Sequence, residues 1–399
     1  MANVLHKKDF EILDSLRGIA ALYVTIGHCR GSLWMGGEQF LKLNPMSTWH
    51  FYDYVIFGIS LLSRLAVEFV IVFFVLSGFS IAHSLSANKS PGKFYIRRLI
   101  RIYPPYLVAL IWASLVYAVT LYLLPQWYDG SMREFVFSRT ITMNNFFDWD
   151  VMLKNIFYMP HFGGFIGPFW SLTYEVMFYL MAPFLLRRVN LYFIISFMLF
   201  LIDNVFPASV EALHLHKYFY EFLFVYNIYF AIGVLLYNYF PVLLRLVDKI
   251  HPKLFLVAIL SVWAVVYAFN IYFQMETNYS FMAAAFLSAF MITYFIRHQV
   301  TIPWLMSIGK FSYTLYITHY PTLIIYLAIY HLIVVPDKNY IENFLIWIPA
   351  VFFCIAVAYI HYLLVENKTK NILDRLRRKR YGRISDIKSG SVQTERNKI

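Results

Sequence analysis

The first apolar stretch of the chain reads Asp14-Ser-Leu-Arg17-Gly-Ile-Ala-Ala-Leu-Tyr-Val-Thr-Ile-Gly-His28, and it carries an arginine and a histidine among residues that favour lipid. In an α-helix these two side chains project from nearly the same face, about 16 Å apart along the axis. That separation is roughly half the thickness of the hydrocarbon core of a bilayer. Ionisable residues inside a membrane helix are costly, so Arg17 and His28 are candidates for function.

Arg17 and His28 also allow a purely structural interpretation. The arginine could extend its charged end to the lipid headgroups, and the histidine could hydrogen-bond a neighbouring helix. For either residue alone, the sequence leaves both interpretations open. Motifs further along the chain favour the functional interpretation, because they add more polar groups to apolar segments.

The composition of the 399-residue chain predicts a membrane protein. It is 60% hydrophobic and only 14% charged, whereas a soluble domain carries roughly 25% charged residues. The net charge of +12 therefore reflects membrane topology and does not indicate a nucleic-acid partner. Cys29 and Cys354 lack the spacing of a metal site, and we expect no bound metal.

Apolar runs separated by prolines and charged clusters predict an all-α polytopic protein with about ten transmembrane helices. When the N-terminus is placed in the cytoplasm, about three quarters of the lysines and arginines fall on the cytoplasmic side. We therefore expect both termini in the cytoplasm, a membrane domain over 1–366 and a basic tail over 367–399 that contacts anionic lipids. The predicted helices cover 12–31, 62–86, 100–124, 168–186, 190–206, 219–240, 254–274, 279–297, 308–334 and 343–365.

Three arginines, Arg97, Arg98 and Arg101, crowd one predicted cytoplasmic helix start, directly before Tyr103-Pro104-Pro105. Such clusters usually anchor a helix at the cytoplasmic surface. Guanidinium groups at the start of a helix also make a phosphate site. Coenzyme A is a cytosolic molecule with a pyrophosphate and a 3′-phosphate, so the cluster allows either an anchor or a binding site for such a donor.

The predicted helix over 168–186 places a carboxylate in an apolar segment. Ser171, Glu175 and Tyr179 recur at a spacing of four residues and share one helix face. A buried carboxylate has to be paired or neutral, and we expect Arg17 and His28 as the partners of Glu175. A structural ion pair is the alternative to a catalytic role.

Two further motifs are less specific. The Ser77-Gly78 pair within Phe73-Phe-Val-Leu-Ser-Gly-Phe79 predicts a close approach of two helices or a local kink. Glu68 precedes this motif on the opposite face, and we expect it to meet water near the outer end of the helix. Ser312, Tyr316 and His319 form another stripe, in which His319 could line a pocket or, slightly favoured, stabilise a kink near Pro321.

Taken in order, these motifs resemble the acyltransferase-3 family of integral membrane acyltransferases, whose members acylate cell-surface polysaccharides such as O-antigen. The resemblance covers about residues 10–366. It implies acetyl-coenzyme A, or another acyl-coenzyme A, as a cytosolic donor and a hydroxyl of a cell-surface carbohydrate or lipid-linked glycan as acceptor. It also implies a bacterial inner membrane. The motifs that carry it are Arg17 with His28, Phe73 to Phe79, Arg97-Arg98 with Arg101 and Tyr103-Pro104, Trp170-Ser171 with Glu175, and Ser312-Tyr313 with Tyr316 and His319.

By this resemblance the catalytic pair falls on Arg17 and His28, to which we add Glu175, and the donor-binding residues are Arg97, Arg98 and Arg101, with Tyr103 beside them. His28 would act as general base or would carry the acyl group itself. A proton-coupled transporter of a small anionic or lipid-linked solute is the alternative function. The sequence indicates no oligomeric state. The expected pocket residues are Ser77, Trp170, Ser171, Tyr179, Ser312, Tyr316 and His319.

Overall fold

The computed structural model of the protein describes residues 5, 7–87, 90–128, 147–159, 166–273, 278–334 and 341–373. These segments are almost entirely helical and contain no strand, which confirms the predicted all-α class. The helices are α1 (Lys7–Leu33), α2 (Gly37–Leu43), α3 (Phe51–Leu62), α4 (Ala66–Ala87), α5 (Pro91–Leu123), α6 (Trp149–Ile156), α7 (Trp170–Leu185), α8 (Val189–Val205), α9 (Pro207–Glu211), α10 (Lys217–Tyr220), α11 (Asn227–Val247), α12 (Pro252–Phe273), α13 (Asn278–Arg297), α14 (Pro303–Gly309), α15 (Ser312–Val334) and α16 (Trp347–His361).

Seven helical segments within the described residues are long and apolar enough to cross a membrane. The chain is therefore an integral, multi-pass membrane protein. One of the seven, Gly167–Val205, joins α7 and α8, for which the sequence predicts two separate spans. The count of about ten spans and the cytoplasmic side of both termini stay predictions. Another segment, Phe344–Leu373, continues past the predicted domain boundary at residue 366, and residues 374–399 of the predicted tail lie outside the described residues.

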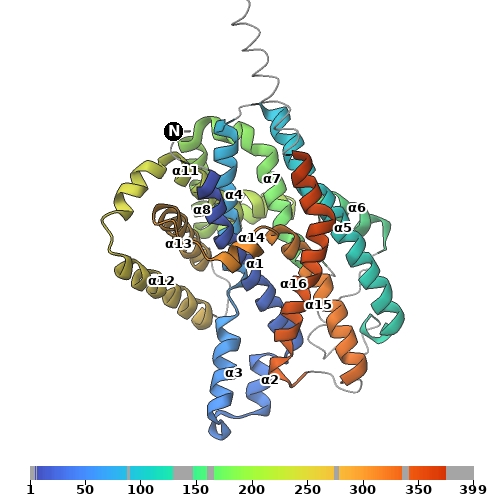
Figure 1. The fold of residues 1–399 in the computed structure, drawn as a ribbon. Helices are drawn as coiled ribbons and strands as arrows, with labels where there is room; N and C mark the ends of the chain where they lie inside the picture. The colour runs from blue at the N-terminus through green and yellow to red at the C-terminus, as the bar shows by residue number, and fades with distance from the viewer. Residues whose placement is uncertain are drawn as a thin grey trace, which may run out of the picture.

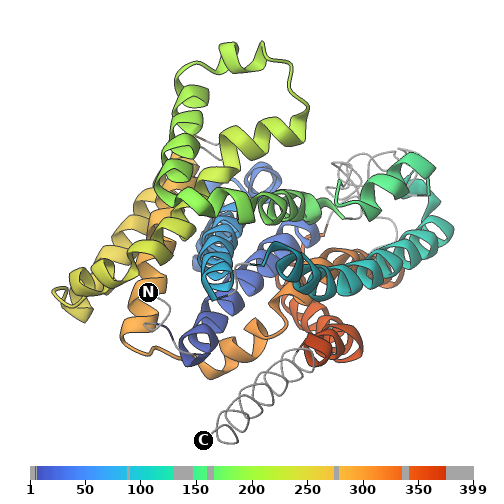
Figure 2. The same cartoon turned by 90° about the horizontal axis from the view of Figure 1, so that it is seen from above.

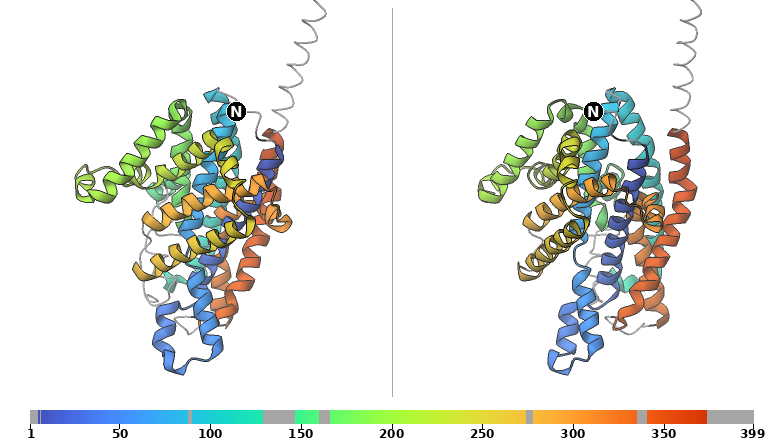
Figure 3. Two further views of the ribbon diagram at one scale, coloured as in Figure 1. Left: turned by 90° about the vertical axis from the view of Figure 1, so that its left-hand side faces the viewer. Right: turned by 60° about the vertical axis from the view of Figure 1, so that its left-hand side comes forward.

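α1 lies at the centre of the bundle, where it packs against α4, α14, α15 and α16 (Figure 1). α4 in turn packs against α11 and α13, and α5 packs against α15. Figure 2 and Figure 3 show α8 and α9 projecting sideways from this bundle. α2 and α3 project from the end opposite to the start of α1 (Figure 1). The start of α1 and the end of the Phe344–Leu373 segment lie at the same end of the molecule.

Glycines let α4 and α11 cross at very short range. A Cβ atom added to Gly78 of α4 would lie 2.2 Å from the carbonyl oxygen of Phe230, and one added to Gly233 of α11 would lie 2.1 Å from that of Val75. Backbones approach this closely only where side chains are missing. The close approach predicted at Ser77-Gly78 is confirmed, and it fixes the position of the neighbouring Ser77.

Replacing Gly78 with alanine is expected to lower the free energy of unfolding by about 1–3 kcal/mol, because the added methyl group would push α4 away from α11. The measurement is the thermal unfolding of the protein purified in detergent. Gly58→Ala in α3 is the matched control, since a Cβ atom there meets nothing within 4 Å. Equal stability of the two variants would contradict the proposed importance of the crossing.

A second pair of glycines brings α14 against α1. A Cβ atom added to Gly309 would lie 1.8 Å from the carbonyl oxygen of Asp14, and one added to Gly18 would lie 2.1 Å from that of Leu305. α15 begins at Ser312, directly after this contact. The start of α15 is thereby held beside Arg17, the residue that precedes Gly18.

Candidate functional site

Two adjoining cavities lie among α1, α4, α5, α7 and α15. The wide cavity has a volume of about 650 Å³ and the narrow cavity about 100 Å³. They meet at a common set of lining residues, so that the wide cavity leads into the narrow one. The residues that line both cavities are Arg17, Arg98, Arg101, Ser312 and Tyr313.

The wide cavity is cationic. It lies where α1 and α5 begin and where the Phe344–Leu373 segment ends. Its charged lining consists of the cations Arg17, Arg97, Arg98, Arg101, Lys310 and Lys370 and the acids Glu11, Asp14 and Glu366.

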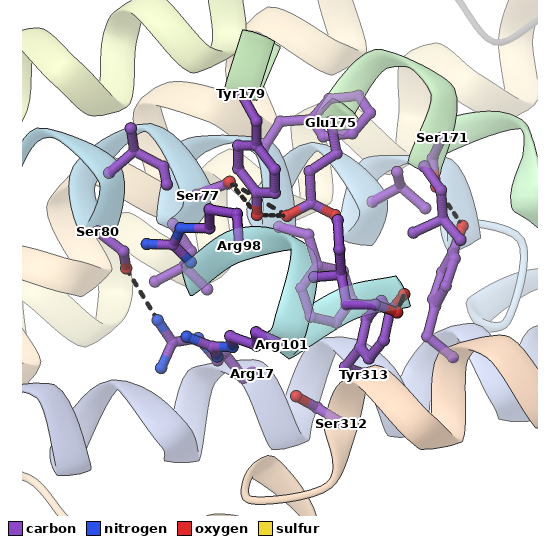
Figure 4. Close-up of a pocket in the computed structure, with 18 residues that line it drawn as sticks. Arg17, Ser77, Ser80, Arg98, Arg101, Ser171, Glu175, Tyr179, Ser312 and Tyr313 are labelled. Carbon is purple, nitrogen blue, oxygen red and sulfur yellow. Dashed lines mark hydrogen bonds between the residues drawn. The ribbon is translucent and has the colours of Figure 1, made fainter. Parts of the chain in front are cut away.

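Arg17 is held between α1 and α4 at the junction of the two cavities. Its Nη1 donates to Asp14 Oδ1 at 2.7 Å. Its Nη2 donates to Ser80 Oγ at 2.9 Å (Figure 4). The described acidic partner of Arg17 is therefore Asp14, one helical turn earlier, and the predicted pairing with Glu175 is wrong. Two fixed hydrogen bonds orient the guanidinium group toward the cavity and leave further N–H groups for a ligand.

Glu175 lines the narrow cavity and is surrounded by hydroxyl groups. Tyr179 donates its hydroxyl proton to Glu175, and Ser77 Oγ lies 3.2 Å from Glu175 Oε1 and 3.3 Å from the Tyr179 hydroxyl (Figure 4). The guanidinium carbon of Arg98 lies 5.3 Å from the centre of the Tyr179 ring. The prediction that Arg17 and His28 would be the partners of Glu175 is thus replaced by a cluster that joins α4, α5 and α7.

Ser171 and Tyr316 join the start of α7 to α15 at the narrow cavity. The Tyr316 hydroxyl donates to the carbonyl oxygen of Pro168 at 2.7 Å. Ser171 Oγ lies 2.7 Å from the same hydroxyl, and it is the donor because the single Tyr316 proton is already used. Both residues line the cavity, together with the rings of Phe73 and Phe74.

His28 lies outside the lining of either cavity. Its ring centre is 5.2 Å from that of His319 and 5.4 Å from that of Tyr320. The His319 ring is in turn 5.8 Å from the ring of Tyr316, which lines the narrow cavity. A series of ring contacts therefore leads from the narrow cavity through His319 to His28, while Arg17 belongs to the wide end.

The two cavities bring together most of the residues expected from the sequence, namely Arg17, Ser77, Arg97, Arg98, Arg101, Ser171, Glu175, Tyr179, Ser312 and Tyr316. Four expected residues lie outside the lining of both cavities, namely the ring pair His28 and His319 described above, Trp170 and Tyr103. Trp170 packs against Tyr226 and against Phe74, a lining residue of the narrow cavity, and its own place in the pocket stays a prediction. Tyr103 lies beside Tyr158 and lines a neighbouring cavity of about 430 Å³ together with Arg98 and Tyr179, so its place among the donor-binding residues stays a prediction.

Sequence reasoning missed several residues of the site. Lys370 bonds to Glu366 at 2.7 Å, and Glu366 also accepts a hydrogen bond from Thr314. The spacing of four residues between Glu366 and Lys370 was the available signal.

Glu68 lies outside the site. It is fully buried and accepts a hydrogen bond from Ser280 at 3.0 Å, so the expectation that it meets water is wrong.

Comparison with known proteins gives the following matches. A family model described as an acyltransferase domain matches residues 10–363. A curated protein of Rhizobium radiobacter named "Protein 2 in picA locus" is 33% identical over 120 residues, which are 29% of this chain and 49% of that protein. The chain thus spans about half the length of this curated relative. No solved structure gives a significant match.

Proposed function

Since this chain belongs to the acyltransferase family whose model matches residues 10–363, we propose that it moves an acyl group from acyl-coenzyme A to a hydroxyl group. The proposed donor is cytosolic acetyl-coenzyme A or another acyl-coenzyme A. The proposed acceptor is a cell-surface carbohydrate or a lipid-linked glycan. The proposed setting is a bacterial inner membrane, with anionic lipid contacting the tail over 367–399. Membership of the family favours this function over the transporter that the sequence also allowed.

The observation that carries the proposal is the cationic wide cavity that leads into a narrow one. Acyl-coenzyme A has the same form, with a bulky phosphorylated head and a slender arm that ends in a thioester. The wide cavity of about 650 Å³ suits part of the head, and the narrow cavity of about 100 Å³ suits the arm. We assign the phosphates to Arg98 and Arg101, because guanidinium groups bind phosphate oxygens through paired N–H donors.

The thioester would reach the far end of the narrow cavity, near Tyr316, with His319 and His28 beyond it. In the general-base form of the reaction, His28 takes the proton of the acceptor hydroxyl while that oxygen bonds to the acyl carbon. The carbon–sulfur bond breaks, and the same proton passes to the departing thiolate. In the carrier form, the ring nitrogen of His28 bonds to the acyl carbon while the carbon–sulfur bond breaks and the thiolate departs. The acceptor oxygen then bonds to the acyl carbon, the carbon–nitrogen bond breaks, and the hydroxyl proton passes to the thiolate.

The proposed function is tested by following radiolabelled acetyl from acetyl-coenzyme A into membrane polysaccharide. Membranes that contain the chain are compared with membranes from the same cells that lack it. Label incorporated only when the chain is present supports the proposal. A purified chain that neither binds acyl-coenzyme A nor transfers any of a series of acyl groups would overturn it.

A further inference from the structure

His319 is a fully buried imidazole in the middle of α15, two residues before Pro321. Its ring is 5.8 Å from that of Tyr316, which lines the narrow cavity, and 5.2 Å from that of His28. The residue is therefore the contact between the proposed donor cavity and the proposed catalytic histidine. Its two ring nitrogens have different surroundings.

The hydrogen bond of His319 fixes its tautomer. Nδ1 lies 3.1 Å from the carbonyl oxygen of Leu315. A carbonyl oxygen only accepts hydrogen bonds, so Nδ1 must carry the proton. In the neutral ring Nε2 then has a free lone pair and can only accept a hydrogen bond.

Nε2 of His319 is buried and has no hydrogen-bond partner in the described part of the chain. A buried polar atom without a protein partner calls for an explanation. The neighbouring hydroxyl of Tyr316 already donates its proton to Pro168. The imidazole of His28 is a neighbour that can supply an N–H group, since its ring centre lies 5.2 Å from that of His319.

The surrounding helices hold the two imidazoles at the same level. Cys354 of α16 donates its thiol to the carbonyl oxygen of His319 at 3.4 Å. The sulfur of Cys29, the residue after His28, lies 4.0 Å from the sulfur of Cys354. Both cysteines are fully buried, and α1, α15 and α16 contact one another beside the histidine pair. This packing limits how far the two rings can move apart.

We propose that His319 is the positioning residue of His28. Its Nε2 accepts a hydrogen bond from one ring nitrogen of His28, which leaves the other nitrogen of His28 with a lone pair for the transfer reaction. When His28 gains a proton or an acyl group it becomes positively charged, and a hydrogen bond from a charged donor is stronger than a neutral one. This inference rests on the proposed function, because it assigns a partner to the histidine that carries the reaction.

Two substitutions distinguish the proposed role of His319 from a purely structural role. His319→Asn keeps an amide N–H near the position of Nδ1, so it can still donate to Leu315, but it has no acceptor at the position of Nε2. His319→Gln reaches the position of Nε2 with an amide oxygen that can accept from His28. A residue that only stabilises the kink of α15 would tolerate the asparagine better than the glutamine.

The experiment measures kcat and the KM for acetyl-coenzyme A with the full chain in lipid nanodiscs. His319→Asn is expected to lower kcat about 100-fold and to change KM less than about twofold, since the lost interaction acts on the reacting state. His319→Gln is expected to retain at least about tenfold more activity than His319→Ala. His331→Asn, another buried histidine of α15, is the matched control and is expected to keep the kcat of the intact chain.

Full activity of His319→Asn would overturn the inference while the proposed function stands. Equal kcat values for His319→Gln and His319→Ala would also overturn it, and this comparison holds even if the asparagine variant does not accumulate. Loss of kcat together with a large rise in KM would indicate a collapsed cavity and not a lost partner of His28. An intact chain without transferase activity would overturn the proposed function itself, and the inference with it.

Discussion

Replacing His28 with alanine is expected to reduce acyl transfer by about 1000-fold or more, because the proposed reaction passes through the imidazole of this residue as base or acyl carrier. The cavities that we assign to the donor do not include His28 in their lining. Insertion into the membrane and binding of acyl-coenzyme A should therefore be preserved. The effect is confined to the transfer step. The rate constant of this step is read from single-turnover transfer of labelled acetyl at saturating donor.

The control for His28→Ala is His216→Ala, which removes an exposed imidazole before α10. The two variants are compared at equal expression and equal donor binding. Transfer at the rate of the intact chain by His28→Ala would show that the reaction does not pass through this residue. Loss of transfer in both variants would point instead to a general effect on the membrane preparation.

Replacing Arg98 or Arg101 with leucine is expected to raise the KM for acyl-coenzyme A about 10- to 100-fold, since a hydrogen bond to a charged group contributes about 1.5–3 kcal/mol. Both arginines line the wide and the narrow cavity at their junction. Their charges act on phosphates, which the reaction does not change, so kcat should fall less than the affinity. Binding of the donor to the intact chain should also weaken as salt is added.

The matched control is Arg187→Leu, which removes an arginine between α7 and α8 that lines neither cavity. A donor without the 3′-phosphate adds a second comparison. It should bind the intact chain more weakly than the complete donor, and the difference should shrink in whichever arginine variant has lost the contact to that phosphate. An unchanged KM in both variants at the cavity junction would contradict the assignment of the phosphates to Arg98 and Arg101.

The sequence predicted which side chains share a helix face, because that depends on local periodicity. Ser171, Glu175 and Tyr179 all line the narrow cavity as their spacing required. It did not predict Ser77 as a partner of Glu175, because the two residues are 98 positions apart and meet where α4 packs against α7. Partner choice over such distances is decided by packing between helices, and spacing along one helix does not determine it.

The sequence also did not predict the burial of single acidic residues. Glu68 was expected in water because it lies near a helix end, but α13 covers it and Ser280 donates to it.

Lys370 was not predicted as a cavity residue, because a lysine after the last apolar segment is ordinarily part of a basic tail. Only the arrangement of α1, α5 and the Phe344–Leu373 segment around one cavity reveals that it faces Arg17 and Arg101.

The junction of the two cavities is lined by Arg17, Arg98 and Arg101, and this has a consequence for turnover. These residues would bind the phosphates, which the reaction does not change. Free coenzyme A would therefore bind about as tightly as acyl-coenzyme A. Such uniform binding favours occupancy and not the chemical step. The enzyme would respond to the ratio of acylated to free coenzyme in the cell, with the free form as a competitive inhibitor.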